Sequence, residues 1–283
     1  MPEQNDLAPL SIDGLADYHC HCDYSVDAKG GIEEYCDAAL KKGLAELCFT
    51  THYDSNPRSV DDANFISVKG KRVPVGIEPL KSYVEEVNLA RDKYYPLGLS
   101  VLTGLEFGWY AGCEEQVQKL KETFDFDYML VGVHELDDIC FCCANSYEKC
   151  FQRYSLDRMV TAYFAEVVRA ARTRLFDTVA HLEYYKKYGE KYYGPSLDRA
   201  HASYLSDVFK ALIESDTALE INTAARRRGF DSYYPQLEII NLAKKAGVDV
   251  IHLGSDAHVP EHVGFDFDAA ASLIPAAIGG CDD

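Results

Sequence analysis

The chain has 283 residues, which suits one α/β barrel of about 250 residues or two smaller domains. Acidic residues outnumber basic ones by 46 to 28, and the formal net charge of −18 argues against a nucleic-acid partner, because such a surface repels phosphates. Residues 1–14 lack the basic and apolar regions of a signal peptide, and no apolar run approaches the ~20 residues of a membrane span, so we expect a cytoplasmic protein with mostly reduced thiols and no membrane partner.

Short β-type runs alternate with amphipathic helical patterns along the chain. In the first helical pattern, Ile32, Tyr35, Cys36 and Ala39 recur at helical spacing, and Gly43 marks the stop. The predicted strands cover residues 15–18, 44–50, 99–103, 128–133, 176–180, 218–222 and 248–253. The predicted helices cover residues 31–42, 79–94, 112–123, 156–172, 197–214 and 235–246.

This βα alternation favours a parallel sheet, because each helical crossover returns the chain to the same end of the sheet. An open doubly wound sheet and a closed barrel both satisfy the pattern. We prefer a barrel, because polar residues fall just beyond the strands, and a parallel barrel opens all strand C-termini onto the one face where active sites are built. The sequence shows no linker or repeat, so we expect one domain over residues 1–283.

Histidines and carboxylates follow six of the seven predicted strands. They are His19 and His21 after the first strand, His52 after the second, Glu106 after the third, His134 after the fourth, His181 after the fifth, and Asp256 and His258 after the last. Because side chains alternate along a strand, His19 and His21 can point together while Cys20 points away. Burying this many ionisable groups without a cation would cost several kcal/mol, so the pattern predicts a metal centre.

The residue types also indicate which metals bind and what they do. Imidazole and carboxylate ligands without thiolate suit zinc, iron or manganese. The candidates outnumber the ligands of one tetrahedral zinc, which implies at least two ions with Glu106 as the bridge. Two ions about 3.5–4 Å apart activate a water and stabilise an in-line displacement at phosphorus, so we expect a phosphoester hydrolase that uses a metal-bound hydroxide.

Four further cysteines are grouped in the sequence at Cys140, Cys142, Cys143 and Cys150. A structural zinc site usually shows two C-x-x-C pairs, and this spacing does not. Buried or incidental thiols are our preferred interpretation, while a separate metal site and redox control stay open. Among the remaining histidines, we expect structural roles for His201 and His252.

The ordered set of motifs resembles the PHP superfamily, named for polymerase and histidinol phosphatase. The motifs are DYHCHCDYSVD at 17–27, THYD at 51–54, GLEFG at 104–108, GVHEL at 132–136, AHLEYYKKYG at 180–189 and GSDAH at 254–258. Within the superfamily, the chain most resembles the histidinol-phosphatase branch. The segments that carry this finer resemblance are LEINTAARRRG at 219–229 and SDAHVPEHVG at 255–264. Glu183, Ala224 and Ala225 depart from the pattern of the branch.

The resemblance implies a distorted (β/α)7 TIM-like barrel with a cluster of two to three metal ions at the C-terminal face of the strands. The implied ligands are His19, His21, Glu106 and Asp256 for the first ion, Glu106, His134 and His181 for the second, and His52 and His258 for the third. Asp27 stands where some members supply a third-ion histidine, and its carboxylate can also bind a cation.

The resemblance further implies hydrolysis of L-histidinol phosphate to L-histidinol and phosphate, a step of histidine biosynthesis. We expect Glu106, Asp256 and Arg227 to be catalytic, and Arg227 with Arg158 to bind the phosphate, because guanidinium presents paired donors. A nuclease, a phosphatase for another small phosphoester, and a non-catalytic metal-binding regulatory module are the alternatives. The sequence does not set the oligomeric state.

Overall fold

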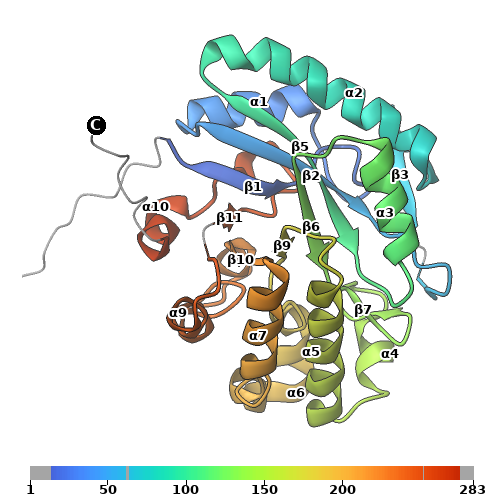
Figure 1. Ribbon diagram of the computed structural model, residues 1–283, viewed down its shortest axis with the longest axis vertical. Helices are drawn as coiled ribbons and strands as arrows, with labels where there is room; N and C mark the ends of the chain where they lie inside the picture. The colour runs from blue at the N-terminus through green and yellow to red at the C-terminus, as the bar shows by residue number, and fades with distance from the viewer. Residues whose placement is uncertain (1–13, 62–63, 251, 275–283) are drawn as a thin grey trace, which may run out of the picture.

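Seven parallel strands form a nearly closed barrel in the computed structural model, which describes residues 14–61, 64–250 and 252–274 (Figure 1). The strands follow the order β1-β2-β5-β6-β9-β10-β11, and each neighbouring pair in this order is parallel. Their bounds are β1 Ala16–Cys20, β2 Glu46–Tyr53, β5 Ser100–Gly108, β6 Tyr128–Gly132, β9 Thr178–Val179, β10 Ala218–Asn222 and β11 His252–Gly254. The predicted α/β barrel is therefore confirmed. Residues 1–13, which hold most of the segment judged not to be a signal peptide, lie outside the described residues.

The barrel closes where the first strand meets the segment that follows the last. The backbone N–H of Asp256 donates to the carbonyl of His19 at 2.8 Å, and the N–H of His21 donates to the carbonyl of Ala257 at 2.8 Å. Cys20 and Ala257 form a parallel bridge between these two bonds. Two motifs that are far apart in sequence are thus joined by backbone hydrogen bonds at the carboxyl end of the barrel.

Helices cover the outside of the barrel, with α1, α2 and α3 on one side in Figure 1 and α5, α6 and α7 on another. The helix bounds are α1 Ile32–Lys41, α2 Ile77–Tyr94, α3 Glu114–Thr123, α4 Tyr147–Phe151, α5 Leu156–Arg172, α6 Lys186–Tyr193, α7 Leu205–Ser215, α8 Ala224–Arg227, α9 Leu237–Ala246 and α10 Phe267–Ala270. Short 3-10 helices are η1 Tyr95–Leu97, η2 Gly194–Arg199, η3 Pro260–His262 and η4 Ala271–Leu273.

The first helix shows how the sequence pattern determines these elements. The predicted apolar stripe of α1, with Ile32 and Tyr35 among its members, is buried. Gly43 then adopts a φ of 80° while its N–H bonds to the carbonyl of Leu40, a conformation that glycine accepts without steric penalty. The predicted stop at Gly43 is confirmed, and the chain turns directly into β2.

Several elements differ from the sequence prediction. Two hairpins were not predicted, one formed by β3 Phe65–Val68 and β4 Lys71–Pro74, the other by β7 Glu135–Leu136 and β8 Ile139–Cys140. The helix predicted over 197–214 begins at Leu205, since η2 and a turn occupy the preceding residues. Pro195 lies in the first turn of η2, where its fixed φ favours the start of a new short helix. Both hairpins are too short for a reliable alternating pattern.

A small cluster fills the inside of the barrel at mid-height. It joins Cys48, Tyr128, Leu130 and Ala180, with Tyr18 and Leu102 packed against it. Because side chains alternate along β5, the side chain of Glu106 shares the inner face with that of Leu102, nearer the carboxyl end. Inside the barrel, the polar residues of the strand ends therefore lie next to this apolar cluster, on its carboxyl-end side.

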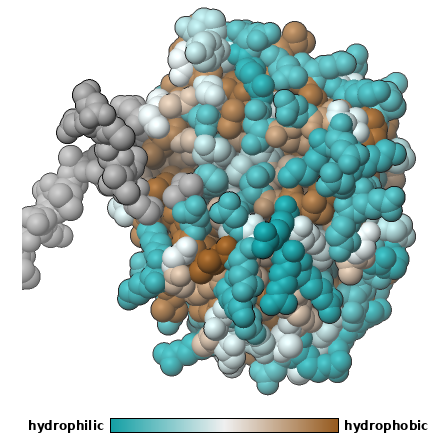
Figure 2. Space-filling view, in the orientation of Figure 1, coloured by the Kyte–Doolittle hydropathy of each residue, from teal (hydrophilic) through white to brown (hydrophobic). Residues whose placement is uncertain are grey.

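The face of the molecule shown in Figure 2 is mainly hydrophilic, with hydrophobic residues in patches between polar ones. No helix in the described part of the chain is long and apolar enough to cross a membrane.

Candidate metal centre

Glu106 lies at the centre of the predicted histidine cluster and is completely buried. One carboxylate oxygen, Oε1, lies 2.7 Å from Nε2 of His181 and 3.2 Å from Nε2 of His134. The other oxygen, Oε2, lies 2.8 Å from Nδ1 of His52, 3.3 Å from Nε2 of His19 and 3.4 Å from Nε2 of His21. Each oxygen of the carboxylate therefore faces its own group of imidazoles, an arrangement suited to a ligand that bridges two cations.

The first group of candidate ligands joins the two ends of the barrel sheet. The Nε2 atoms of His19 and His21 are 3.0 Å apart, so the expectation that these two side chains point together is correct. Oδ1 of Asp256 lies 3.5 Å from Nε2 of His21 and 3.9 Å from Nε2 of His19. Cys20 points elsewhere, with its Sγ 3.2 Å from the carbonyl of Cys48, as alternation predicted.

The second and third groups lie on either side of the first. In the second, Nε2 of His134 and Nε2 of His181 are 3.5 Å apart beside Oε1 of Glu106. In the third, Nε2 of His52 and Nε2 of His258 are 3.4 Å apart. The carboxylate of Asp27 lies 3.3 Å from Nε2 of His258 and 3.9 Å from Nε2 of His52. All nine residues proposed as metal ligands are thus brought together at one end of the barrel.

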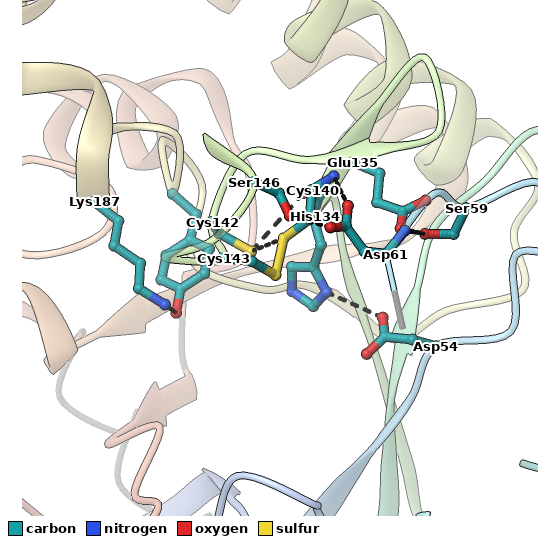
Figure 3. The surroundings of a disulfide bond; sticks show 11 residues. Asp54, Ser59, Asp61, His134, Glu135, Cys140, Cys142, Cys143, Ser146 and Lys187 are labelled. Atoms are coloured by element: carbon teal, nitrogen blue, oxygen red, sulfur yellow. Dashed lines mark hydrogen bonds and ion pairs between the residues drawn. A yellow bond between two sulfur atoms is a disulfide. The ribbon is translucent and has the colours of Figure 1, made fainter. Parts of the chain in front are cut away.

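Two acidic residues outside the candidate ligands hold imidazole rings in place. Oε1 of Glu220 lies 2.7 Å from Nδ1 of His19, and its Oε2 accepts the backbone N–H of His181 at 2.6 Å. Oδ1 of Asp54 lies 3.4 Å from Nδ1 of His134 (Figure 3). A carboxylate on Nδ1 turns Nε2 toward a metal and fixes its lone pair there.

The sequence prediction did not single out Glu220, because it lies inside strand β10 with no histidine beside it. Its companion in the LEIN segment, Asn222, donates to Oε2 of Glu220 at 3.1 Å. Two polar side chains at i and i+2 of an otherwise apolar strand were the signal that could have identified the pair.

Two buried carboxylate oxygens show that the site fits cations. Oδ2 of Asp256 has no hydrogen-bond partner among the described residues, and Oε2 of Glu106 faces only imidazole nitrogens, the nearest being Nδ1 of His52. Burial alone would raise the pKa of Glu106, but the neighbouring imidazoles, His19 first, hold it well below its usual range. The pKa of Asp256 is held low in the same way against burial, chiefly by His21. Ionised, buried and incompletely paired carboxylates are stable when they coordinate metal. These donor types suit divalent zinc, iron or manganese.

A cavity of about 1080 Å³ opens beside the cluster. Five cationic side chains line it together with the candidate ligands; they are Arg72, Lys187, Arg226, Arg227 and Arg228. A cavity with cations beside a metal cluster is suited to an anionic ligand such as a phosphate.

The guanidinium of Arg227 contacts the backbone around Asp256. It donates to the carbonyl of Ser255 and, at 2.8 Å, to the carbonyl of Asp256, and it lies over the ring of Phe265. Asp256 has a φ of 50°, which is uncommon for a residue other than glycine. Arg227 therefore supports the unusual turn that presents the Asp256 carboxylate.

Tyr184 connects two other cations of the cavity to the metal ligands. Its ring stacks on that of His181, with centroids 4.1 Å apart. Its hydroxyl accepts from Nζ of Lys187 at 3.2 Å and from the guanidinium of Arg228 at 3.4 Å. Burial lowers the pKa of Lys187, with nearby Arg228 adding to the effect. Both cations are thereby held on the wall that borders the second ligand group.

The structure does not bring Arg158 to this cavity. The residue is exposed in the first turn of α5 and is not among the residues that line the cavity. Its predicted role in phosphate binding is therefore not supported, whereas Arg228 lines the cavity. Helical spacing alone could not show which way the first turn of α5 faces.

Glu183 and His201 form a buried network away from the candidate ligands. Oε1 of Glu183 lies 2.9 Å from Nζ of Lys186 and 3.4 Å from Nδ1 of His201. Its Oε2 accepts the N–H of Gln236, the residue that caps α9. The departure from the family pattern at Glu183 thus falls on a structural contact. His252 is also structural, because its Nδ1 lies 2.6 Å from the hydroxyl of Tyr128 inside the barrel.

Three of the grouped cysteines line the cavity, and two of them form a disulfide, Cys140–Cys143 (Figure 3). Cys142 lies beside this pair, while Cys150 is a free, buried cysteine on α4. The preferred interpretation of the group as buried or incidental thiols is therefore wrong for Cys140 and Cys143, which form a disulfide, whereas Cys142 and Cys150 are buried free thiols.

Comparison with known proteins gives the same family from sequence and from fold. The family model described as the PHP domain matches residues 17–224. A probable histidinol-phosphatase of Deinococcus radiodurans is 33% identical over 261 residues, covering 92% of this chain and 93% of the relative. A probable histidinol-phosphatase of Clostridium acetobutylicum is 27% identical and covers 91% of each chain.

Two solved structures share the fold. One is a histidinol phosphate phosphatase of Lactococcus lactis in complex with zinc, L-histidinol and phosphate, at a TM-score of 0.72 and 20% identity, covering 92% of both chains. The other is a putative histidinol phosphatase of Listeria monocytogenes, at a TM-score of 0.77 and 17% identity, covering 90% of this chain and 99% of that one. By its matched motifs, its close relative and its distorted seven-stranded barrel, the chain belongs to the PHP-domain family.

Proposed function

We propose that the chain is a metal-dependent phosphatase that hydrolyses L-histidinol phosphate to L-histidinol and phosphate, with two to three divalent ions bound at the strand ends. The observation that carries the proposal is the position of Glu106, whose two oxygens face separate groups of imidazoles, His134 and His181 on one side and His19, His21 and His52 on the other. The names of the curated relatives, which align over most of the chain, support the same reaction.

We infer one ion for each of the three groups of candidate ligands. The first ion would be held by His19, His21, Glu106 and Asp256, the second by Glu106, His134 and His181, and the third by His52, His258 and Asp27. When bound, divalent ions of this kind supply a nucleophile from water near neutral pH and neutralise charge on the phosphoryl oxygens. Zinc, iron and manganese all suit these donors.

The protein itself contributes substrate orientation through cationic side chains. Arg228 and Lys187 lie on the cavity wall beside Tyr184, where their charges can hold the phosphoryl oxygens that the metals leave unpaired. Arg227 acts mainly as a positioning residue, because two of its donors are already bound to the carbonyls before and at Asp256. Asp256 and Glu106 are proposed to act as ligands, which makes them essential to the reaction without direct proton transfer.

The opposite part of the cavity lining is acidic and matches the alcohol portion of the substrate. Asp54, Asp61 and Glu135 line it. L-Histidinol phosphate carries a cationic amine on the carbon next to its phosphorylated CH2 group and a basic imidazole at the end remote from the phosphate. A cavity with cations at one end and carboxylates at the other favours such a dipolar substrate over a purely anionic one.

Turnover of a substrate panel with metal analysis tests the proposal. The panel contains L-histidinol phosphate, a phosphomonoester of a neutral alcohol of similar size, and a short oligonucleotide. We expect kcat/KM to be highest for L-histidinol phosphate and activity to disappear with a chelator. Preferred cleavage of the oligonucleotide would indicate a nuclease instead. Metal binding without turnover of any substrate would indicate a non-catalytic regulatory module.

A further inference from the structure

Three sulfur atoms meet in the loop that follows the β7–β8 hairpin, at the wall of the catalytic cavity. Cys140 and Cys143 form a disulfide, with their Cα atoms 5.6 Å apart. Sγ of Cys142 lies 3.4 Å from Sγ of Cys140, and all three sulfurs lie within 4.8 Å of one another. Cys142 itself is a free thiol, so the redox pair under consideration is Cys140 and Cys143.

The three cysteines differ in how far a molecule in the cavity can reach them. Cys140 and Cys142 are buried, whereas Cys143 is half-buried. All three contribute to the lining of the cavity, as Figure 3 shows for their position beside His134. A small thiol that enters the cavity would therefore meet the Cys143 sulfur first.

The cysteine loop is bonded directly to a proposed metal ligand. The N–H of Phe141 donates to the carbonyl of His134 at 3.0 Å, and Sγ of Cys142 lies 3.8 Å from the same carbonyl. The other side of the loop is fixed by the N–H of Cys140, which donates to Asp61 at 2.8 Å. The disulfide joins Cys140 to Cys143 and so encloses Phe141 and Cys142, the two residues that contact the His134 carbonyl. Breaking it would therefore loosen the support of His134.

We propose that Cys140 and Cys143 form a reversible disulfide, a thiol–disulfide exchange site that reports the redox state of small thiols to the metal centre through His134. Its effect on turnover rests on the proposed function, whereas its effect on metal binding does not. The oxidised form is the one in which His134, His181 and Glu106 converge. Reduction is therefore expected to weaken the second ligand group and lower activity.

The exchange balances with a small dithiol as reductant. One thiolate of the dithiol attacks the Cys143 sulfur, and Cys140 leaves as a thiolate that takes a proton. The second thiolate of the dithiol attacks its own sulfur in the mixed disulfide, and Cys143 leaves as a thiolate that is also protonated. Two electrons and two protons pass to the cysteines, and the dithiol becomes a cyclic disulfide. A small-molecule disulfide reverses the reaction.

Differential alkylation of the wild-type chain tests the site without any activity assay. Free thiols are alkylated in denaturant before and after dithiothreitol, and the labelled cysteines are located by peptide mass. We expect Cys140 and Cys143 to be labelled only after reduction. If both are labelled without reductant, the proposal is wrong. Protection that is lost on treatment with a chelator alone would identify a bound soft metal ion, which also refutes the disulfide.

Single substitutions identify which cysteines form the reductant-sensitive disulfide. Cys140→Ser removes the atom nearest to Cys142 and bonded to Cys143, so the reductant-dependent label should vanish. Cys142→Ser should keep it. The control is Cys150→Ala, a buried cysteine that does not line the cavity, which should also keep it. A reductant-dependent label that persists in Cys140→Ser would place the redox pair elsewhere and overturn the assignment.

The coupling to the metal centre is tested on oxidised and reduced protein, after the dithiol is removed without oxygen. Mn²⁺ is the probe, because it prefers oxygen and nitrogen ligands to thiolates. We expect severalfold weaker Mn²⁺ binding and severalfold lower turnover after reduction, both restored by a small-molecule disulfide and both absent in Cys140→Ser. Equal Mn²⁺ affinity in the two states would refute the coupling. Absent turnover in both states, with a difference in affinity, would refute only the proposed function.

Discussion

Oε1 of Glu220 on strand β10 lies 2.7 Å from Nδ1 of His19 on strand β1, although 201 residues separate them. Both side chains are buried, and the other oxygen of Glu220 holds the backbone N–H of His181. One carboxylate thus fixes a side chain from the first ligand group and the backbone of a ligand in the second. The sixth strand of the barrel contributes support to the site without contributing a ligand.

Replacing Glu220 with glutamine tests this support. The amide must turn a donor toward either Nδ1 of His19 or the backbone N–H of His181, so one of the two contacts is lost. Losing such a contact typically weakens metal affinity or activity by about 10- to 100-fold. We expect that loss in kcat/KM and in Mn²⁺ affinity for Glu220→Gln.

The matched control for this variant is Glu46→Gln. Glu46 begins β2 at the opposite end of the barrel and accepts a hydrogen bond from Tyr18. It should retain wild-type metal affinity. If Glu220→Gln kept wild-type values in both measurements, Glu220 would be only a structural residue of β10.

Glycine is required at position 132 because Glu106 and His134 occupy the space that a side chain there would fill. A Cβ at this position would lie 2.8 Å from Oε1 of Glu106 and would clash with the ring of His134. Gly132→Ala should therefore displace the second ligand group and reduce both the metal content and turnover. Elemental analysis and kinetics on the purified variant measure the two effects.

Gly76→Ala is the control for the alanine substitution itself. Its backbone is extended, and a Cβ there would meet only Pro79 at an ordinary 3.9 Å. It should behave as the wild type. A Gly132→Ala variant with full metal content and activity would contradict the position of Glu106 and His134 described here.

Arg227 is expected to act on metal assembly as well as on substrate. Arg227→Ala removes two donors from the turn that presents Asp256, and each charge-assisted bond is typically worth about 1.5–3 kcal/mol. By that estimate, kcat/KM should fall roughly 10- to 100-fold. Arg227→Lys should recover only part of this, because an ammonium cannot donate to both carbonyls in the same fork.

Metal content decides between the two possible roles of Arg227. A positioning residue predicts less metal per chain in Arg227→Ala at limiting metal concentration. Full metal content with a loss confined to KM would show that Arg227 binds phosphate directly.

Arg228 is the residue for which we predict direct phosphate binding. Arg228→Ala should raise KM and the inhibition constant for inorganic phosphate by roughly tenfold, the typical loss for one charge-assisted contact, while the metal content stays unchanged. The comparison is Arg226→Ala, since the guanidinium of Arg226 is paired with Asp231 and Asp266. Equal phosphate inhibition in the Arg228 variant and the wild type would remove Arg228 from the site.

The sequence predicted the site better than it predicted the loops around it. His19 and Glu106 lie near the carboxyl ends of β1 and β5, and Asp256 lies just beyond β11. A parallel barrel gathers its strand ends whatever the loop lengths, so the cluster followed from the fold class. Arg158 and Arg228 show the limit of this reasoning. Arg158 lies in the exposed first turn of α5, and Arg228 directly follows the short helix α8. Which of them reaches the cavity depends on tertiary contacts, and the sequence prediction chose Arg158.

Interactions between distant segments were also beyond the sequence pattern. Glu220 has no polar signal beyond Asn222, and its partner His19 lies on another strand. The pairing of Cys140 with Cys143 depends on how the β7–β8 hairpin turns the loop, and two-residue strands leave no alternation to detect.

Metal removal should destabilise the chain, because Oδ2 of Asp256 is buried without a hydrogen-bond partner in the described structure and Oε2 of Glu106 faces only imidazole nitrogens. A ligand that binds only the folded state stabilises it by about 2.7 kcal/mol when its free concentration is 100 times Kd. For a domain of this size, that corresponds to an increase in Tm of roughly 5–10 °C. We expect such an increase when Mn²⁺ or Zn²⁺ is added to chelator-treated protein, measured by thermal unfolding.

Asp256→Asn should fold but lose most of the increase and all turnover, whereas Asp157→Asn, an exposed residue of α5, should keep both. A metal-dependent increase in Tm of the same size in Asp256→Asn and the wild type would mean that the stabilising ion binds elsewhere.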